Sequence, residues 1–131
     1  MRSLHVLVAE DNPLNQVMAV GALKRLGHTG VVVDDGEKAL RALAKQQFDV
    51  VLMDIMMPNL DGLATLAAIR ANEKSSQRHL PVVMATAHDL PGDRERLIEA
   101  GADGYVAKPV TASALQAELE RVLGSTRRIH Q

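Results

Sequence analysis

Three acidic residues fall where they could act together. Glu10 and Asp11 directly follow the apolar run 4–9, and Asp54 directly follows the apolar run 49–53. If both runs are strands of one parallel sheet, their carboxyl ends meet at the same edge. Carboxylates this close repel one another, and a hard divalent cation that prefers oxygen ligands relieves the repulsion. The spacing therefore predicts a Mg2+ site held mainly by the adjacent acidic pair.

Two further groups would reach the same edge. Thr86 ends the apolar run 81–86, and Lys108 follows the run 104–107. A metal, an ammonium and a hydroxyl around a carboxylate suit phosphoryl transfer, because the cations neutralise charge on the phosphoryl oxygens. A carboxylate can also be the nucleophile and form an aspartyl-phosphate. We predict that Asp54 is this nucleophile.

Strand-length apolar runs alternate with helix-length segments along the chain. The expected strands are residues 4–9, 29–33, 49–53, 81–86 and 104–107, and the expected helices are residues 13–26, 36–46, 63–72, 92–100 and 112–123. The runs contain stretches of three or more consecutive apolar residues, which is typical of strands covered on both faces. The order predicts an α/β fold, in which a strand and a helix repeat five times around a doubly wound, five-stranded parallel sheet.

Turn and capping residues agree with these limits. Asn12 can cap the first helix, Pro13 suits its first turn, and Gly27 suits a left-handed end. The segment Asp34-Asp35-Gly36 suits a turn and a cap before the second helix, and Thr111 fits a cap of the fifth.

Length and composition restrict the function. The 131 residues suit one domain, expected over residues 1–124, with residues 125–131 as a basic tail or linker remnant. The net charge of −1 and the 2% aromatic content argue against direct binding of nucleic acid. The absence of cysteine disfavours zinc and disulfides. No apolar run is long enough to span a membrane, and no signal peptide is evident, so we expect a cytoplasmic protein.

Four segments together resemble the receiver domain of two-component response regulators. They are "VLVAEDNPLNQ", "FDVVLMDIMMPNLDG", "PVVMATA" and "GADGYVAKPV", within a similarity that covers about residues 4–123. The resemblance implies a flavodoxin-like receiver fold and a self-phosphorylating and dephosphorylating signalling module rather than an enzyme. The phosphate donor would be a phosphohistidine on a histidine kinase or a histidine phosphotransfer domain. The module would be a monomer or a weak dimer that depends on phosphorylation.

The resemblance also implies roles for single residues. Asp54 would be the phosphorylated residue, and Lys108 would bind a phosphoryl oxygen. Thr86 would be the switch hydroxyl, and Tyr105 the aromatic switch residue that follows it. Lys108 would precede a cis peptide bond to Pro109.

The same resemblance completes the metal site. Asp11 and Asp54 would bind Mg2+ directly, and Met56 would contribute its backbone carbonyl. Glu10 would act through a metal-bound water. The segment "EDNPLNQ" is similar to receivers attached to hybrid sensor kinases, while a stand-alone regulator stays open.

Three other functions fit the sequence less well. A flavodoxin-like cofactor binder would need a Ser/Thr/Gly-rich cradle after the first strand, where this chain has "EDN". A phosphatase with an aspartate nucleophile would need Asp-x-Asp there and a cap domain. A degenerate receiver, which only binds partners, would lack an acidic residue or the lysine.

Several other residues have ordinary interpretations. The charged segment 93–96 is expected to form a solvated helix face. His88 is expected to be a solvent-facing loop residue rather than a proton carrier. Met56 or Met57 could be partly exposed near Asp54.

Overall fold

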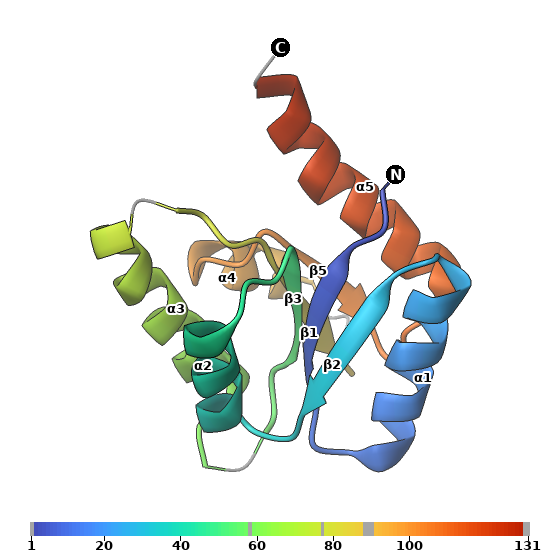
Figure 1. The fold of residues 1–131 in the computed structure, drawn as a ribbon, viewed down its shortest axis with the longest axis horizontal. Helices are drawn as coiled ribbons and strands as arrows, with labels where there is room; N and C mark the ends of the chain where they lie inside the picture. The colour runs from blue at the N-terminus through green and yellow to red at the C-terminus, as the bar shows by residue number, and fades with distance from the viewer. Residues whose placement is uncertain (1, 58, 77, 88–90, 130–131) are drawn as a thin grey trace.

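Strands and helices alternate along the chain (Figure 1). A computed structural model describes residues 2–57, 59–76, 78–87 and 91–129, with the backbone alone at residues 75–76 and 125–129. Within these residues the elements are β1 (His5–Ala9), α1 (Pro13–Arg25), β2 (Thr29–Val33), α2 (Gly36–Lys45), β3 (Val50–Asp54), α3 (Gly62–Ser76), β4 (Val82–Thr86), α4 (Asp93–Glu99), β5 (Gly104–Ala107) and α5 (Ala112–Ile129).

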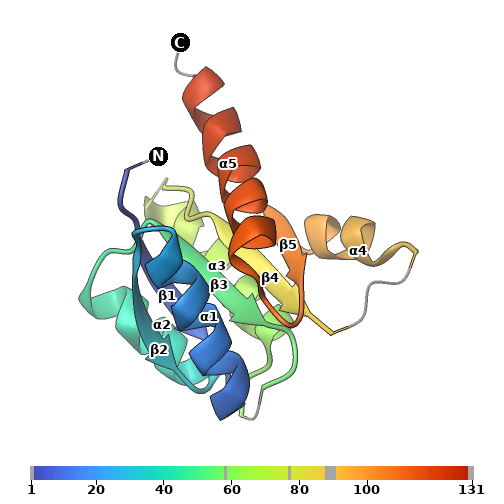
Figure 2. The same ribbon diagram turned by 90° about the vertical axis from the view of Figure 1, so that its right-hand side faces the viewer.

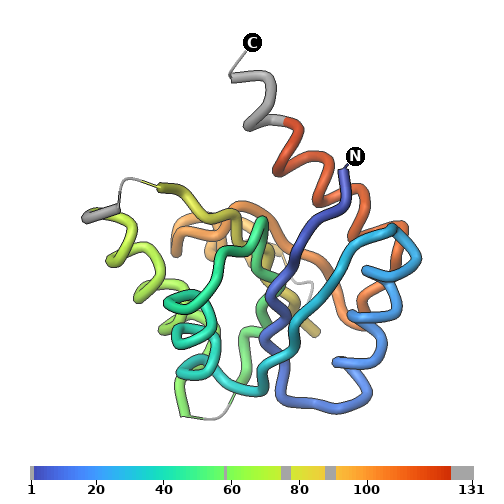
Figure 3. Tube along the Cα trace, in the orientation of Figure 1, coloured from blue at the N-terminus to red at the C-terminus, as the bar shows by residue number. Residues whose placement is uncertain are grey.

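The strands form one parallel sheet in the order β2-β1-β3-β4-β5 (Figure 2). The strand order reverses direction beside β1, between β1 and β3, which is where doubly wound sheets bind ligands. All strands run the same way, so their carboxyl ends share one edge. The chain enters β1 at the opposite edge, the edge past which α5 extends (Figure 3). The predicted doubly wound, flavodoxin-like α/β fold is confirmed.

Two apolar clusters fill the two faces of the sheet. Helices α1 and α5 cover one face, where Leu23 and Leu119 pack on the sheet, and α2, α3 and α4 cover the other, where Leu66 packs (Figure 1). Every residue of β3 and β4 is buried, as expected for strands covered on both sides. Strand β2 is an edge strand and is largely exposed, although it ends in three consecutive valines.

Helix ends follow the predicted caps. The Asn12 side chain accepts a hydrogen bond from the Asn15 N–H at 3.1 Å, and Asp35 accepts one from the Lys38 N–H at 2.8 Å. Thr111 accepts a 3.3 Å hydrogen bond from the N–H of Ala114. Gly27 follows α1 with a φ of 83°, which is the left-handed conformation that glycine adopts without strain.

Two helices are longer than the sequence predicted. Helix α3 ends at Ser76 rather than residue 72, and α5 ends at Ile129 rather than residue 123. In both cases the apolar periodicity stops before the backbone hydrogen bonds do, because a helix that leaves the sheet no longer needs an apolar face. The role of residues 125–131 as a linker remnant stays a prediction. None of the described helices is long and apolar enough to cross a bilayer.

The loop after β3 returns very close to its strand at Gly62. The Gly62 N–H donates to the Ile55 carbonyl at 2.8 Å. A Cβ atom at Gly62 would lie 2.1 Å from the backbone oxygen of Asp54 and 2.8 Å from the Ile55 Cα. Only glycine therefore lets α3 begin against the end of β3, next to Asp54.

We predict that Gly62→Ala lowers the free energy of unfolding by roughly 1–3 kcal/mol, because the backbone beside Asp54 must shift. The measurement is the urea unfolding midpoint. Gly21→Ala is the control, because among the described atoms none lies within 4 Å of a Cβ at this position in α1. It should raise stability by about 0.5–1 kcal/mol through helix propensity. A Gly62→Ala protein as stable as the original would contradict the close approach.

Candidate functional site

The carboxyl ends of four strands bring the predicted site residues together. Glu10 follows β1, Asp54 ends β3, Thr86 ends β4 and Lys108 follows β5. Backbone hydrogen bonds fix their relative positions, since the Lys108 N–H donates to the Thr86 carbonyl at 2.8 Å. Glu10, Asp54 and Thr86 are buried, with 4%, 5% and 6% of each residue exposed. The sequence prediction that these residues converge is borne out by the geometry.

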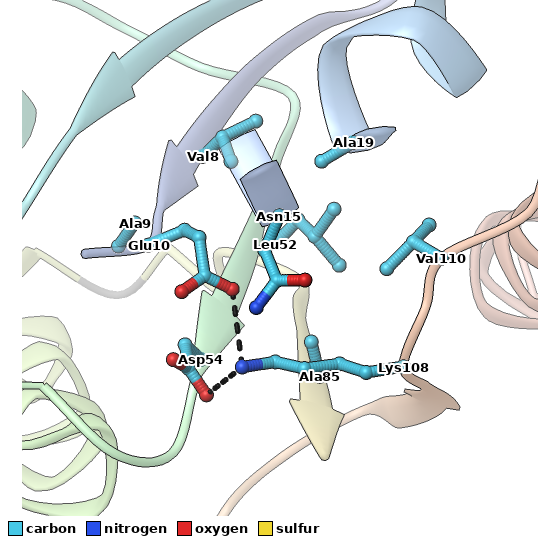
Figure 4. A pocket seen from close by; sticks show the side chains of 10 residues that line it. All are labelled: Val8, Ala9, Glu10, Asn15, Ala19, Leu52, Asp54, Ala85, Lys108 and Val110. Carbon is cyan, nitrogen blue, oxygen red and sulfur yellow. Dashed lines mark ion pairs between the residues drawn. The ribbon is translucent and has the colours of Figure 1, made fainter. Parts of the chain in front are cut away.

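Lys108 joins the two buried carboxylates (Figure 4). Its Nζ lies 2.7 Å from Asp54 Oδ1 and 3.1 Å from Glu10 Oε1. The peptide bond between Lys108 and Pro109 is cis, as the resemblance implied. Removing charges from water is costly unless they are paired, so this ion-pair triad is what allows the carboxylates to be buried.

The pKa shifts of Glu10 and Lys108 show how the charges of the site compensate one another. Burial raises the pKa of Glu10, and the nearby Asp54 carboxylate adds to the rise, while hydrogen bonds from the Asn12 N–H and Lys108 oppose it. Burial alone would lower the pKa of Lys108, but its hydrogen bonds to Asp54 and Glu10 outweigh burial and raise it. One ammonium facing two carboxylates leaves an excess of negative charge at the site.

That excess extends to a third carboxylate. Ligand oxygens of Glu10, Asp11 and Asp54 all lie within 4.8 Å of one another. Asp11 is exposed, so a metal can be reached from solvent on that side. An oxygen-only set of three carboxylates fits a hard divalent cation such as Mg2+, which keeps several of its waters. These residues therefore fit the predicted metal, with Met56 close by through its N–H, which donates to Asp54 Oδ1 at 3.3 Å.

Asp54 also opens onto a cleft of about 370 Å³ between β3, β4 and α4. The cleft is lined by Asp54, Ile55, Met56, Thr86, Ala87, Asp93, Arg96, Leu97 and Lys108. Met56 is 75% exposed at this cleft, as expected for one of the two methionines near Asp54. The Asp54 carboxylate thus pairs with Lys108 on one side and lines the cleft on the side of α4.

Tyr105 lies outside that cleft, on the face formed by α4, β5 and α5. The guanidinium carbon of Arg94 is 5.8 Å from the centroid of its half-buried ring. The backbone N–H of Tyr105 donates to Glu118 Oε2 at 2.7 Å, and Glu118 also pairs with Arg121 at 2.8 Å. The switch role of the ring stays a prediction.

The sequence analysis missed two features of the site. Asp93 is buried and pairs with Arg96 across one helical turn, so the expected solvated face over residues 93–96 is wrong at this position. The spacing of three residues between opposite charges was the available signal. Asn15 lies beside the Glu10–Lys108 ion pair (Figure 4). His88, which the sequence predicts as a solvent-facing loop residue, lies outside the described residues.

Comparison with known families agrees with this geometry. Residues 6–120 match the model of the response regulator receiver domain, so the chain belongs to that family. The receiver resemblance is therefore confirmed. The chain is a signalling module of two-component systems, with the fold and the acidic cluster that the resemblance implied.

Its relatives include sensor kinases. It is 39% identical over 115 residues to hybrid signal transduction histidine kinase I of Dictyostelium discoideum. This match covers 84% of this chain and 7% of the relative. It is 37% identical over 115 residues to the sensor protein GacS of Pseudomonas syringae, which covers 87% of this chain and 13% of the relative. The chain thus spans a small part of these relatives, and the similarity to receivers of hybrid kinases is confirmed.

Solved structures show the same fold. The receiver domain of sensor histidine kinase PA1611 from Pseudomonas aeruginosa, with a magnesium ion in its active site cleft, has a TM-score of 0.80 and 38% identity, and the match covers 94% of this chain and 99% of that one. The chemotaxis response regulator CheY4 of Vibrio cholerae has a TM-score of 0.81 and 28% identity, with 92% and 99% covered.

The raised pKa of Glu10 predicts that Glu10→Gln stabilises the metal-free protein at pH 7. A raised pKa means that ionising Glu10 costs more in the folded state than in the unfolded state. The cost is present at neutral pH and disappears below the ordinary pKa of glutamate, about 4.3, where both states are protonated. The gain in urea midpoint, measured in EDTA, should therefore vanish near pH 4.

Glu118→Gln is the control of opposite sign. Burial acts to raise the pKa of Glu118, but hydrogen bonds from Arg121 and from the Tyr105 N–H outweigh it and lower the pKa. This stabilisation is present above the ordinary pKa and is lost as the pH falls, so Glu118→Gln should lose about 1–2 kcal/mol at pH 7 and little near pH 3. Two variants that shift stability in the same direction at pH 7 would contradict the electrostatics of the site.

Proposed function

We propose that this chain is the phosphoacceptor of a phosphorelay, and that Asp54 receives the phosphoryl group from a phosphohistidine. The observation that carries the proposal is the position of Asp54. Its carboxylate ends a fully buried strand, lies 2.7 Å from Lys108 Nζ and belongs to the acidic cluster. It also lines the cleft beside α4, so a donor can reach it.

The transfer is a displacement at phosphorus. A carboxylate oxygen of Asp54 attacks the phosphorus atom, and the bond from phosphorus to the donor's imidazole nitrogen breaks. The electron pair of that bond stays on the imidazole, which leaves neutral because its other ring nitrogen carries the proton. Lys108 and the Thr86 hydroxyl both line the cleft and can donate hydrogen bonds to the phosphoryl oxygens.

Mg2+ is the cofactor of this proposal. Asp11 and Asp54 would bind it directly, with the Met56 carbonyl, and Glu10 would act through a bound water. The magnesium ion in the active site cleft of the PA1611 receiver supports the assignment, as does the acidic cluster of this chain. When bound, the metal offsets the negative charge that Lys108 alone leaves uncompensated.

Thr86 and Tyr105 would convert phosphorylation into a surface change. Thr86 would turn toward the new phosphoryl group, and the Tyr105 ring would follow it inward, away from Arg94. Two pre-existing states that differ by a few kcal/mol are enough for such a switch. The change would then appear on the face formed by α4, β5 and α5, where Glu118 holds the Tyr105 backbone.

The remaining parts of the proposal concern the biological setting. The donor would be a histidine kinase or a histidine phosphotransfer domain, and the module would work in the cytoplasm. It would take up one phosphoryl group and lose it again rather than turn over a separate substrate. It would be monomeric, or form a weak dimer when phosphorylated, without direct contact to nucleic acid or membrane.

We predict that incubation with acetyl phosphate and Mg2+ adds a single phosphoryl group to the chain, measured by intact mass. Asp54→Ala should abolish the adduct, because the nucleophilic oxygen is removed. Asp34→Ala is the matched control, since Asp34 is an exposed carboxylate that follows β2 at the same edge of the sheet. This variant should be phosphorylated like the original protein.

EDTA should also prevent the adduct, because the acidic cluster would then lack its cation. A full-yield adduct on Asp54→Ala would refute the acceptor assignment. An adduct that forms equally fast in EDTA would refute the metal assignment and leave the acceptor assignment standing.

A further inference from the structure

The cleft that leads to Asp54 has a second basic residue at its mouth. Arg96 lies on α4 and lines this cleft together with Asp54, Thr86 and Lys108. Its side chain is 77% exposed, whereas the side chain of its ion-pair partner, Asp93, is 8% exposed. Arg96 is therefore attached to the cleft wall through a buried carboxylate while most of its surface faces solvent.

The attachment leaves the guanidinium group capable of further contacts. The ion pair joins one nitrogen, Nη2, to Asp93 Oδ1. Arginine has five N–H donors in a planar fork, and that geometry matches two oxygens of a phosphoryl group. An arginine held in this way can bind an anion without breaking its existing ion pair.

The negative charge of the acceptor site explains how Arg96 could assist the donor. Three carboxylates cluster at the acceptor, and the ammonium of Lys108 already pairs with two of them, Asp54 and Glu10. An incoming donor brings further negative charge toward Asp54. A cation at the entrance that is not engaged with the acceptor carboxylates lowers the repulsion the donor meets and raises its local concentration.

We propose that Arg96 is a second phosphoryl-binding residue, which contacts the donor's phosphoryl oxygens at the cleft mouth, and that Asp93 is its positioning residue. This inference rests on the proposed function of Asp54 and adds a determinant of the rate of phosphorylation. It concerns the phosphoryl group itself, so it applies to a small phosphodonor as well as to a protein donor.

Arg94 shows that the direction of Arg96 is specific to its position. Both arginines belong to α4, but residues two apart on a helix do not share a face. Arg94 lies over the ring of Tyr105 on β5, while Arg96 lines the cleft. The helix therefore presents one arginine to the switch residue and one to the acceptor.

The alternative is that Arg96 only anchors α4 through Asp93. An ion pair with so exposed an arginine contributes little to stability. An anchoring role predicts an effect on unfolding and none on the salt dependence of phosphorylation. A phosphoryl-binding role predicts an effect on the salt dependence of phosphorylation and none on unfolding.

The test is the rate of phosphorylation of the full chain by acetyl phosphate with saturating Mg2+, followed by intact mass at low and high ionic strength. In this reaction an Asp54 oxygen attacks phosphorus, the bond from phosphorus to the acetyl oxygen breaks, and acetate leaves with the electron pair. We expect Arg96→Ala to react about fivefold or more slowly at low salt and to lose much of the salt dependence.

Three further variants sharpen the comparison. Arg96→Lys keeps the charge and should recover part of the rate, while Asp93→Asn should slow the reaction less than Arg96→Ala does. Arg25→Ala removes an equal charge from the end of α1, at the opposite edge of the sheet, and should react like the original protein.

Arg96→Ala within twofold of the original rate at both salt concentrations would overturn the inference. If that variant does not fold by circular dichroism, Arg96→Gln is judged by the same threshold. A different result would refute the acceptor assignment, namely that the original protein gains no adduct on Asp54.

Discussion

The ion pairs of Lys108 with Asp54 and Glu10 are the interaction on which the site depends. Two carboxylates at the end of a buried sheet would be very costly to ionise without a nearby cation. Lys108 compensates part of that cost, but burial, together with the neighbouring Asp54 carboxylate, still raises the pKa of Glu10. The site is thereby stable enough to fold and still electrostatically prepared to receive a metal ion.

That interaction in turn requires the parallel sheet. Glu10, Asp54 and Lys108 come from three different strands, and only a shared carboxyl edge puts them within ion-pair distance. Backbone contacts then set the details. The Lys108 N–H bonds to Thr86, and Gly62 lets the loop after β3 fold back onto the Asp54 backbone. The fold positions the groups, and the chemistry needs little else.

Helix α4 connects the Asp54 site with the rest of the surface. Its Arg96 lines the cleft at Asp54, and its Arg94 lies over Tyr105. Glu118 of α5 holds the Tyr105 backbone from the other side. A movement at Thr86 would therefore act on α4 directly. It would change the surroundings of both arginines, which lie on opposite faces of this short helix. This arrangement gives a physical route from a local change in charge to a change in surface shape.

Much of this molecule follows from the sequence. The alternation of apolar runs with amphipathic segments determined the strand and helix order, because a doubly wound sheet is the fold that buries such runs on both faces. The acidic pair, Asp54 and Lys108 could be placed at one edge for the same reason. The tertiary structure alone decided burial and pairing. It made β2 an edge strand despite its valines. It also paired Lys108 with both Glu10 and Asp54, and it buried Asp93 within a charged helix. Residue type and spacing state which charges are present, whereas only packing determines which of them lose water and must find a partner.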